Sequence, residues 1–319
     1  MIEVKNLTKR YGNHLAVDHL NFTVESGKIY GLLGPNGAGK STTMNIMTGY
    51  LGATEGQVLI DGHDILKEPE EAKKNIGYLP EIPPLYMEMT VREYLEFAAE
   101  LKGIKKDKRE PQIEEVIRLA KLRDVENRLI QNLSKGYKQR VGLAQAVLGF
   151  PEIIILDEPT VGLDPKQIIE IRELIRKLAK KHTVILSSHT LAEVRAVCDY
   201  IMIISGGKLV ASDTTENLEN MMSGKGQIEV EAKASRDEMD HIIRRTGKIK
   251  EVKYRTSASG ITTAQIIAKG GEDIREELFL AFSHGDVPML TRNQSKTTLE
   301  EIFLELTQGS GNRMIKEEK

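Results

Sequence analysis

The sequence predicts an α/β protein that carries a small second domain of α+β type. Three observations lead to this fold class. A glycine-rich loop joins an apolar strand to a helix at residues 34–42, helical periodicity replaces strands between residues 90 and 148, and the order β-α-β-β-α-β follows residue 226. The expected parts are an α/β domain over 1–220 with an antiparallel β subdomain and a helical insertion over about 90–148, a ferredoxin-like accessory domain over 227–307, and a polar tail over 308–319.

Composition narrows the class of protein. The chain has 319 residues, of which 40% are hydrophobic and 29% charged, with a formal net charge of −2. These values suit a globular protein, give no sign of a nucleic-acid partner, and include no apolar run near the ~20 residues that cross a bilayer. Cys198 is the only cysteine, and the N-terminus lacks the apolar core of a signal peptide. We therefore expect a cytoplasmic protein that touches a membrane only through a partner.

Strands are expected on both sides of the glycine-rich loop. Alternating apolar residues predict strands over 2–5 and 15–24, and a short apolar run predicts a buried strand over 28–33. Tyr11 lies beside a Gly12-Asn13 turn, where a ring is usually half-buried packing. Its distance upstream of the loop would also suit a ring stacked on an adenine base.

The loop itself, GPNGAGKST at residues 34–42, fits the template of a phosphate-binding loop. Glycines let backbone N–H groups surround phosphate oxygens, and the following helix directs its positive dipole end at the same anion. A chance glycine-rich turn is disfavoured by the flanking strand and helix. We expect a nucleoside triphosphate here, with Lys40 at its β- and γ-phosphates and Ser41 on Mg²⁺. The predicted binding residues are Tyr11, Asn36, Gly37, Ala38, Gly39, Lys40, Ser41 and Thr42.

Beyond the loop, strands over 57–60 and 76–79 precede a helical block. Apolar residues recur at helical spacing from Val91, and Thr90 with Glu93 predicts a capping box. The basic run 102–109 is expected to be a solvated loop, followed by helices over 110–122 and 137–148.

Two later strands end in residues that can do chemistry. Asp157 and Glu158 follow an apolar strand over 152–156, which is the arrangement of a Walker B site. Asp157 would reach Mg²⁺, and Glu158 would act as the general base that polarises water for attack on the γ-phosphate. Adjacent carboxylates could instead simply cap a turn. His189 follows the strand 183–187. A lone histidine more often has a structural role, but ligands of α/β sheets bind at this end of the strands, which favours a hydrogen bond from His189 to the γ-phosphate.

The C-terminal part has its own pattern. A loosened composition over 221–226 predicts a linker. The elements expected beyond it are strands over 228–232, 252–256, 262–267 and 287–291, helices over 236–245 and 274–282, and a final amphipathic helix over 298–306.

Five motifs together carry a family resemblance. After the loop stand LSKGYKQR at 133–140, ILDEPT at 155–160, GLD at 162–164 and SSH at 187–189. Over roughly the first 220 residues the chain resembles the ATP-binding subunit of an ATP-binding cassette (ABC) transporter, of the bacterial exporter type with a small C-terminal domain. The resemblance implies a P-loop NTPase (ABC ATPase) core that uses ATP and Mg²⁺. It also implies a head-to-tail dimer in which ATP meets Ser134, Lys135 and Gly136 of the partner subunit, with Asp164 coupling the two sites.

Three residues depart from the family pattern. Lys135 and Tyr137 stand where the signature usually has glycine and glutamine, and Glu81 stands where a glutamine usually senses Mg²⁺ and water. A glutamate at position 81 would still ligate Mg²⁺. ATP hydrolysis therefore remains the expected activity, with Lys40, Glu158 and His189 as its catalytic residues and Ser41, Glu81 and Asp157 as the metal ligands.

The resemblance implies an energy-coupling ATPase at the inner face of the cell membrane, working on a separate transmembrane permease. The second ATPase subunit is expected to be another copy of the chain in preference to a different chain, and no nucleic acid is expected. One alternative is a soluble ABC-type ATPase acting on ribosomes or DNA, although such proteins usually carry two cassettes, a long coiled coil or a basic arm. A catalytically weak scaffold subunit and an importer subunit are further alternatives.

Overall fold

The computed structural model describes residues 1–218, 227–257, 260–269, 272–295 and 303. These residues form two compact units, one over residues 1–215 and one within residues 216–305. The expected linker at 221–226, the final helix at 298–306 apart from Phe303, and the tail at 308–319 lie outside the described residues.

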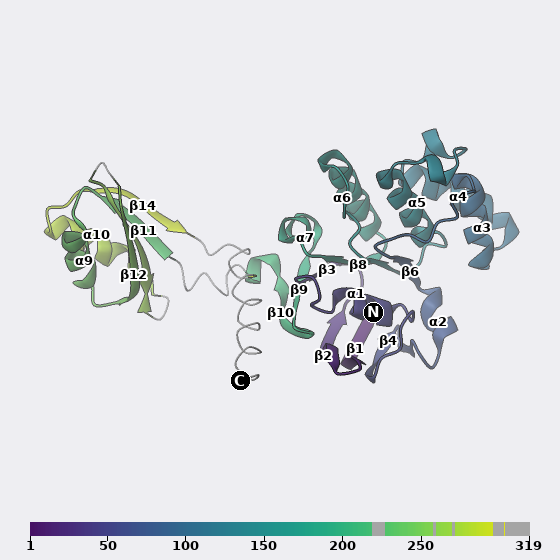
Figure 1. Ribbon diagram of the computed structural model, residues 1–319, viewed down its shortest axis with the longest axis horizontal. Helices are drawn as coiled ribbons and strands as arrows, with labels where there is room; N and C mark the ends of the chain where they lie inside the picture. The colour runs from purple at the N-terminus through teal and green to yellow at the C-terminus, as the bar shows by residue number, and fades with distance from the viewer. Residues whose placement is uncertain (219–226, 258–259, 270–271, 296–302, 304–319) are drawn as a thin grey trace. The chain divides into compact units, whose positions relative to one another are not determined.

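A six-stranded sheet forms the centre of the first unit, with the strand order β10-β9-β3-β8-β7-β6 (Figure 1). All strands run parallel except β10, which pairs antiparallel with β9 at the edge. Every residue of β3, β7 and β8 is buried, which explains why these strands are largely continuous apolar runs in the sequence. The strands are β3 Ile29–Leu33, β6 Ile76–Leu79, β7 Ile153–Leu156, β8 Thr183–Ser188, β9 Tyr200–Ser205 and β10 Lys208–Thr214.

The expected antiparallel subdomain is a second sheet in the same unit, with the order β2-β1-β4-β5. Its strands are β1 Ile2–Tyr11, β2 His14–Val24, β4 Glu55–Ile60 and β5 His63–Asp64. Helix α1, Lys40–Met47, packs in one hydrophobic cluster with both sheets, because Met44 and Met47 are fully buried beside Leu7 and Ile155. This packing fixes the loop between β3 and α1.

The helical insertion contains three long helices that gather at one end of this unit (Figure 1). They are α3 Val91–Leu101, α4 Lys106–Leu119 and α5 Lys135–Val147. The predicted capping box of Thr90 and Glu93 is confirmed. The expected loop over 102–109 is wrong in its second half, because α4 already begins at Lys106. Good helix formers occupy 106–110, and Pro111 near the helix start removes only one backbone donor.

Three further helices belong to the first unit: α2 Pro69–Lys74, α6 Pro165–Ala179 and α7 Leu191–Val197. Among the described residues, none of the helices has both the length and the apolar character needed to cross a membrane.

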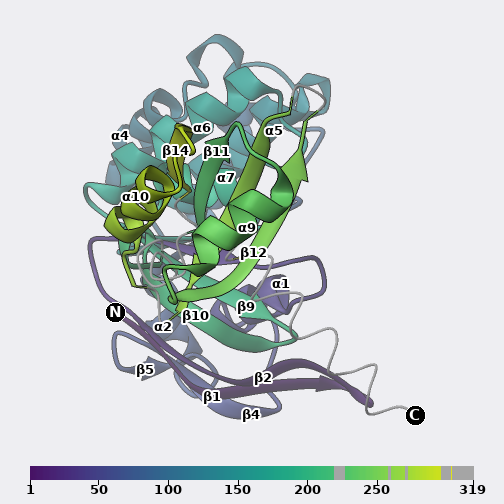
Figure 2. The ribbon, with the colours of Figure 1, turned by 90° about the vertical axis from the view of Figure 1, so that its left-hand side faces the viewer.

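The second unit is a four-stranded antiparallel sheet with the order β12-β13-β11-β14. Figure 2 shows helices α9 and α10 over the same face of this sheet, where Ile243 and Phe282 pack on Val230 and Ile266. A sheet of this order, in which two helices connect strands across one face, is a ferredoxin-like sandwich. Its elements are β11 Gln227–Ala232, α9 Arg236–Arg244, β12 Ile249–Thr256, β13 Thr262–Ala268, α10 Arg275–His284 and β14 Met289–Ser295.

Candidate functional site

The loop between β3 and α1 forms a cradle that requires glycine. Gly39 precedes α1 with a φ of 102°, and a Cβ there would lie 2.5 Å from the carbonyl oxygen of Ala16. A Cβ at Gly34 would lie 2.4 Å from the carbonyl oxygen of Ile204. Because backbone atoms on both sides leave no room for side chains, the loop can present its own N–H groups to an anion.

Lys40 is buried at the start of α1, and its ammonium turns back onto the loop. Its Nζ donates to the carbonyl oxygens of Gly34 at 2.8 Å and Pro35 at 3.3 Å, and lies 3.8 Å from Oε1 of Glu158. Burial lowers the pKa of Lys40, while the negative charges of Glu158 and Asp157 act in the opposite direction.

Oxygen atoms of three residues meet beside Lys40. The Oγ of Ser41 donates to Oδ1 of Asp157 at 3.3 Å, and the Oγ of Ser187 donates to the same oxygen at 2.5 Å. Ser187 also accepts the backbone N–H of Glu158 at 2.9 Å. The parallel register of β7 and β8 pairs Leu156 with Leu186, so Asp157 and Ser187, the next residue of each strand, lie side by side. Hydroxyl and carboxylate oxygens are the ligands that Mg²⁺ prefers, so this donor set fits that ion.

Glu158 is held in an uncommon backbone conformation, with a φ of 47°. This left-handed conformation is costly for a residue with a side chain and recurs at functional sites. The carboxylate is buried, and its Oε2 lies 3.0 Å from Nδ1 of His189, whose ring is half exposed. The pair therefore places a buried carboxylate next to an imidazole that reaches solvent.

Lys40, Ser41, Glu158 and His189 line one cavity of about 510 Å³, a size suited to a nucleotide, whereas Asp157 does not line it. Of the predicted residues, it is lined by Tyr11, Asn36, Gly37, Gly39, Lys40, Ser41, Thr42, Glu81, Glu158 and His189. Ala38 does not line it, because Ala38 is buried under the loop and donates its N–H to the Pro35 carbonyl oxygen.

Sequence reasoning missed four residues of this site. His14, Ala16 and Val161 also line the cavity, and the Ser187 hydroxyl donates a hydrogen bond to the Asp157 carboxylate. Ser187 carried only a partial signal, since it ends the expected strand 183–187, but no local pattern predicts the pairing of that strand with the one before Asp157. The other three carried none, because they enter from turns and a neighbouring sheet.

A second group of predicted residues lies apart from this cavity. Ser134 and Asp164 are exposed and immediately precede α5 and α6, where each accepts a backbone N–H of its own helix. A Cβ at Gly136 would lie 2.5 Å from the side-chain amide carbon of Gln167, so the two helix starts lie against each other. Lys135 is exposed, and its ammonium lies over Gly162.

A larger groove of about 850 Å³ adjoins the cavity. Ser41 and Glu81 also line the cavity and with Asp157 form one side of this groove, while Lys102 and Gln145 line it from the helical insertion. Tyr50 and Ile82, which also line it, are each 82% exposed. The groove thus extends from the oxygens of Ser41 and Asp157 to the exposed side chains of Tyr50 and Ile82.

Comparison with protein families gives one match, to the model described as ABC transporter, over residues 17–161. The bacitracin transport ATP-binding protein BcrA of Bacillus licheniformis is 42% identical over 69% of this chain and 71% of its own length. The linearmycin resistance ATP-binding protein LnrL of Bacillus subtilis (strain 168) is 31% identical over 96% of this chain and 98% of its own length.

Solved structures agree with this result. An ATP-binding subunit of an ABC transporter superposes with a TM-score of 0.64 at 32% identity, over 70% of this chain and 93% of that one. The dimeric cassette MJ0796, bound to ADP and Pi in a post-hydrolysis state, superposes with a TM-score of 0.61 at 28% identity, over 67% of this chain and 98% of that one.

Proposed function

This chain belongs to the ABC transporter family of ATP-binding subunits, and from that membership we propose how its residues use ATP to drive a membrane partner. It binds and hydrolyses ATP as the energy-coupling subunit of a transporter. The observation that carries the residue-level proposal is that Lys40, Glu158 and His189 line one cavity beside a glycine cradle, with Asp157 bonded to Ser41 of the same cavity.

The cavity is proposed to hold ATP by its phosphates and base. Gly37, Gly39 and the N-terminus of α1 surround the phosphates with N–H groups, and Asn36, Ala38 and Thr42 complete the loop. Tyr11 is half exposed at the rim, where its ring can stack on the adenine. Lys40 then exchanges its carbonyl contacts for the β- and γ-phosphates.

Ser41 and Asp157 are proposed to hold Mg²⁺, with Glu81 as a further ligand. The ion would neutralise charge on the phosphates as the bond to the γ-phosphate breaks. Ser187 orients the Asp157 carboxylate through its hydroxyl, so that an oxygen of Asp157 faces Ser41.

Glu158 is proposed as the general base. Its buried carboxylate takes a proton from water as the water attacks the γ-phosphate, and His189 holds that carboxylate in place. His189 reaches solvent from the same rim, which also allows it to hydrogen-bond the γ-phosphate.

The site is proposed to be completed by a second subunit. Ser134, Lys135, Gly136 and Asp164 do not line the chain's own cavity, yet Ser134, Lys135 and Asp164 are exposed at two adjoining helix starts. Such helix starts bind anions, so they can close over the ATP of a partner in a head-to-tail dimer. The dimeric MJ0796 cassette supports this arrangement, and a homodimer is the simplest form of it.

The remaining partner is proposed to be a separate permease that exports its cargo. BcrA, LnrL and the lantibiotic transport protein SrtF of Streptococcus pyogenes support an export role by their names. The groove with Tyr50 and Ile82 offers the permease an apolar docking surface that shares Glu81 with the ATP cavity. The chain would then work at the cytoplasmic face of the membrane, with residues 227–307 as an accessory domain.

Glu158→Gln tests the proposed mechanism. The amide keeps the size of the side chain but cannot accept a proton, so we expect retained ATP binding, a dimer that persists with ATP, and loss of hydrolysis by ~10³-fold or more. Glu193→Gln is the matched control, because Glu193 bonds Thr160 and Ser188 nearby without lining the cavity. Wild-type turnover in the Glu158 variant would remove that residue as the base.

A role on ribosomes or DNA is the second candidate, and no named relative supports it. Purification of the tagged chain from membranes separates the two: co-purification of a membrane-spanning permease supports transport, whereas ATPase stimulation by ribosomes or DNA would overturn it.

A further inference from the structure

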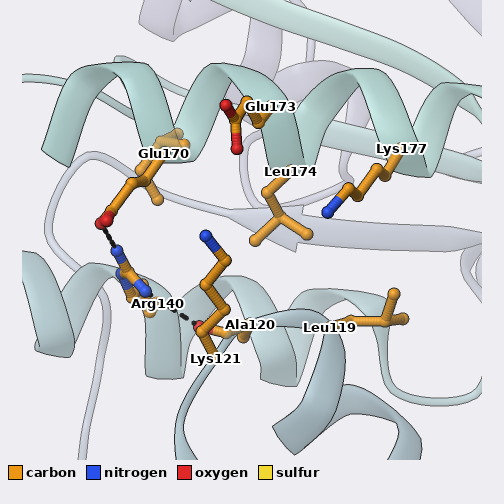
Figure 3. Close-up of a pocket in the computed structure, with 9 residues that line it drawn as sticks. Leu119, Ala120, Lys121, Arg140, Glu170, Glu173, Leu174 and Lys177 are labelled. Carbon is orange, nitrogen blue, oxygen red and sulfur yellow. Dashed lines mark hydrogen bonds and ion pairs between the residues drawn. The ribbon is translucent and has the colours of Figure 1, made fainter. Parts of the chain in front are cut away.

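Arg140 joins three helices at a buried point of the helical insertion. It lies on α5 and is only 9% exposed. Figure 3 shows its guanidinium between α5 and α6, where Nη2 donates to Oε2 of Glu170. Nη1 donates to the carbonyl oxygen of Ala120 at 3.4 Å, at the C-terminal end of α4.

The chemistry of this contact requires arginine. A planar guanidinium can direct separate N–H groups at a carboxylate and at a carbonyl, whereas a lysine presents one point charge. The Ala120 carbonyl also lies at the negative end of the α4 dipole, which favours a cation there. Because the group is buried, loss of either partner leaves an uncompensated polar atom, so the three helices are held in one arrangement.

The same two helices also touch one turn earlier. Gly136 lies against Gln167, four residues before Arg140 and three before Glu170, respectively. Gln167 is itself bound in a capping box with Asp164, with Gln167 N–H donating to Asp164 Oδ1 at 2.9 Å. Helices α5 and α6 therefore start side by side, and both of their exposed first turns are fixed by this pair of contacts.

We propose that Arg140 is a positioning residue, which through Glu170 sets the starts of α5 and α6 so that Ser134 and Asp164 reach the partner subunit's ATP together. This inference rests on the proposed head-to-tail dimer. Arg140 does not line the chain's own cavity. Its effect is therefore exerted on the active site of the other subunit and not on the one in its own chain.

Mixed dimers test this direction of action. Two differently tagged chains are co-expressed and purified over both tags, with one chain carrying Glu158→Gln so that only the site built on the other chain's Glu158 can turn over. Arg140→Met is then placed either in the Glu158→Gln chain or in the other chain. ATP hydrolysis and the ATP concentration for half-maximal rate are measured for both arrangements.

Placed in the Glu158→Gln chain, Arg140→Met should lower turnover on the order of 10- to 100-fold, because that chain supplies Ser134 to the working site. Placed in the other chain, it should leave turnover near that of the mixed dimer without it. Equal losses in the two arrangements would overturn the inference and leave Arg140 as a residue of stability alone.

Further variants separate positioning from folding. Arg140→Met combined with Glu170→Gln should lower turnover little more than Arg140→Met alone, because both changes remove the same ion pair, while Arg140→Lys should restore less than half of the turnover that Arg140→Met loses. Arg140, Glu170 and Lys177 line one small cavity between the helices. Lys177→Met is the matched control, because Lys177 is an exposed cation of this cavity and its loss should leave turnover unchanged. Losses that simply add in the double variant would count against Glu170 as the partner.

Ser134→Ala distinguishes failure of this inference from failure of the dimer. Placed in the same two arrangements, it should lower turnover only in the Glu158→Gln chain. If Ser134→Ala also acts equally in both, the head-to-tail site is wrong and the Arg140 proposal falls with it. If Ser134→Ala is arrangement-dependent and Arg140→Met is not, only the Arg140 proposal falls.

Discussion

Nδ1 of His189 lies 3.0 Å from Oε2 of Glu158, although the two residues are 31 positions apart in the chain. They meet because β7 and β8 are parallel neighbours, so the residues after each strand emerge at the same edge of the sheet. An imidazole that holds a carboxylate in this way fixes which oxygen faces the attacking water.

His189→Ala should lower kcat by about 10²-fold or more while leaving ATP affinity within a few-fold of wild type, because the variant loses positioning and keeps the phosphate cradle. Steady-state hydrolysis and fluorescent-nucleotide titration measure the two quantities. His63→Ala is the control, since His63 is a partly exposed histidine beside Glu68 that does not line the cavity. An unchanged kcat would show that His189 does not act on Glu158.

Ser187→Ala should weaken both the fold and the metal dependence. It removes the partner of the buried Glu158 N–H, which we expect to cost about 1–3 kcal/mol in the free energy of unfolding, and it frees the Asp157 carboxylate. Urea denaturation measures the first effect, and the Mg²⁺ concentration for half-maximal hydrolysis should rise. Ser188→Ala is the control on the same strand, because Ser188 bonds Glu193 and not Asp157; it should leave the Mg²⁺ requirement alone.

Gly39→Ala should abolish ATP binding in isothermal titration. The new methyl group would meet the Ala16 carbonyl oxygen at 2.5 Å, and the φ of 102° disfavours any residue with a side chain. Gly52→Ala is the matched control, since a Cβ at Gly52 meets nothing within 4 Å. Normal ATP binding by the Gly39 variant would mean that the cradle is not the phosphate site.

Lys102→Met should loosen the end of α5. The Lys102 ammonium donates to the carbonyl oxygens of Gln145, Ala146 and Leu148 at 2.7, 3.2 and 2.6 Å. Without this donor the last turn of α5 loses its cap, and we expect a loss of about 1–2 kcal/mol in the free energy of unfolding. Hydrogen exchange at the amides of this turn should rise, and unaltered exchange would contradict the capping role.

The same lysine predicts a pH dependence. Lys102 is an exposed residue as a whole, but desolvation of its ammonium where it meets the carbonyl oxygens at the end of α5 lowers its pKa from the ordinary 10.5 to about 8. Between these pH values the unfolded chain holds a proton that the folded chain has released, so stability should rise with pH across this window. Urea denaturation should show this rise for wild type relative to Lys102→Arg, whose side chain stays protonated throughout. A fall relative to the arginine variant would mean that the carbonyl contacts keep Lys102 charged.

The sequence predicted what depends on short stretches of chain. The loop around Lys40 and the carboxylates at Asp157 could be placed because each follows an apolar run, and parallel strands present their ends at one edge. Ser187 as a holder of Asp157 could not be placed, because its role depends on the register between β7 and β8. The pairing of Arg140 with Glu170 likewise depends on how two helices cross, which no local pattern encodes.

The early start of α4 was missed for a different reason. The basic run over 102–109 favoured a solvated loop, which put the predicted start of this helix at residue 110. The structure begins the helix at Lys106 and tolerates Pro111, since one lost backbone bond costs less than the contacts that α4 makes with α3 and α5.

The contacts of Lys40 with the Gly34 and Pro35 carbonyl oxygens change how a substitution of this lysine should be interpreted. Through these contacts the Lys40 side chain stabilises the loop itself, and a bound phosphate would compete with them. A Lys40 variant would therefore alter the resting loop as well as the loaded one. Its loss of ATP affinity measures the difference between these two states and not the strength of a lysine–phosphate bond.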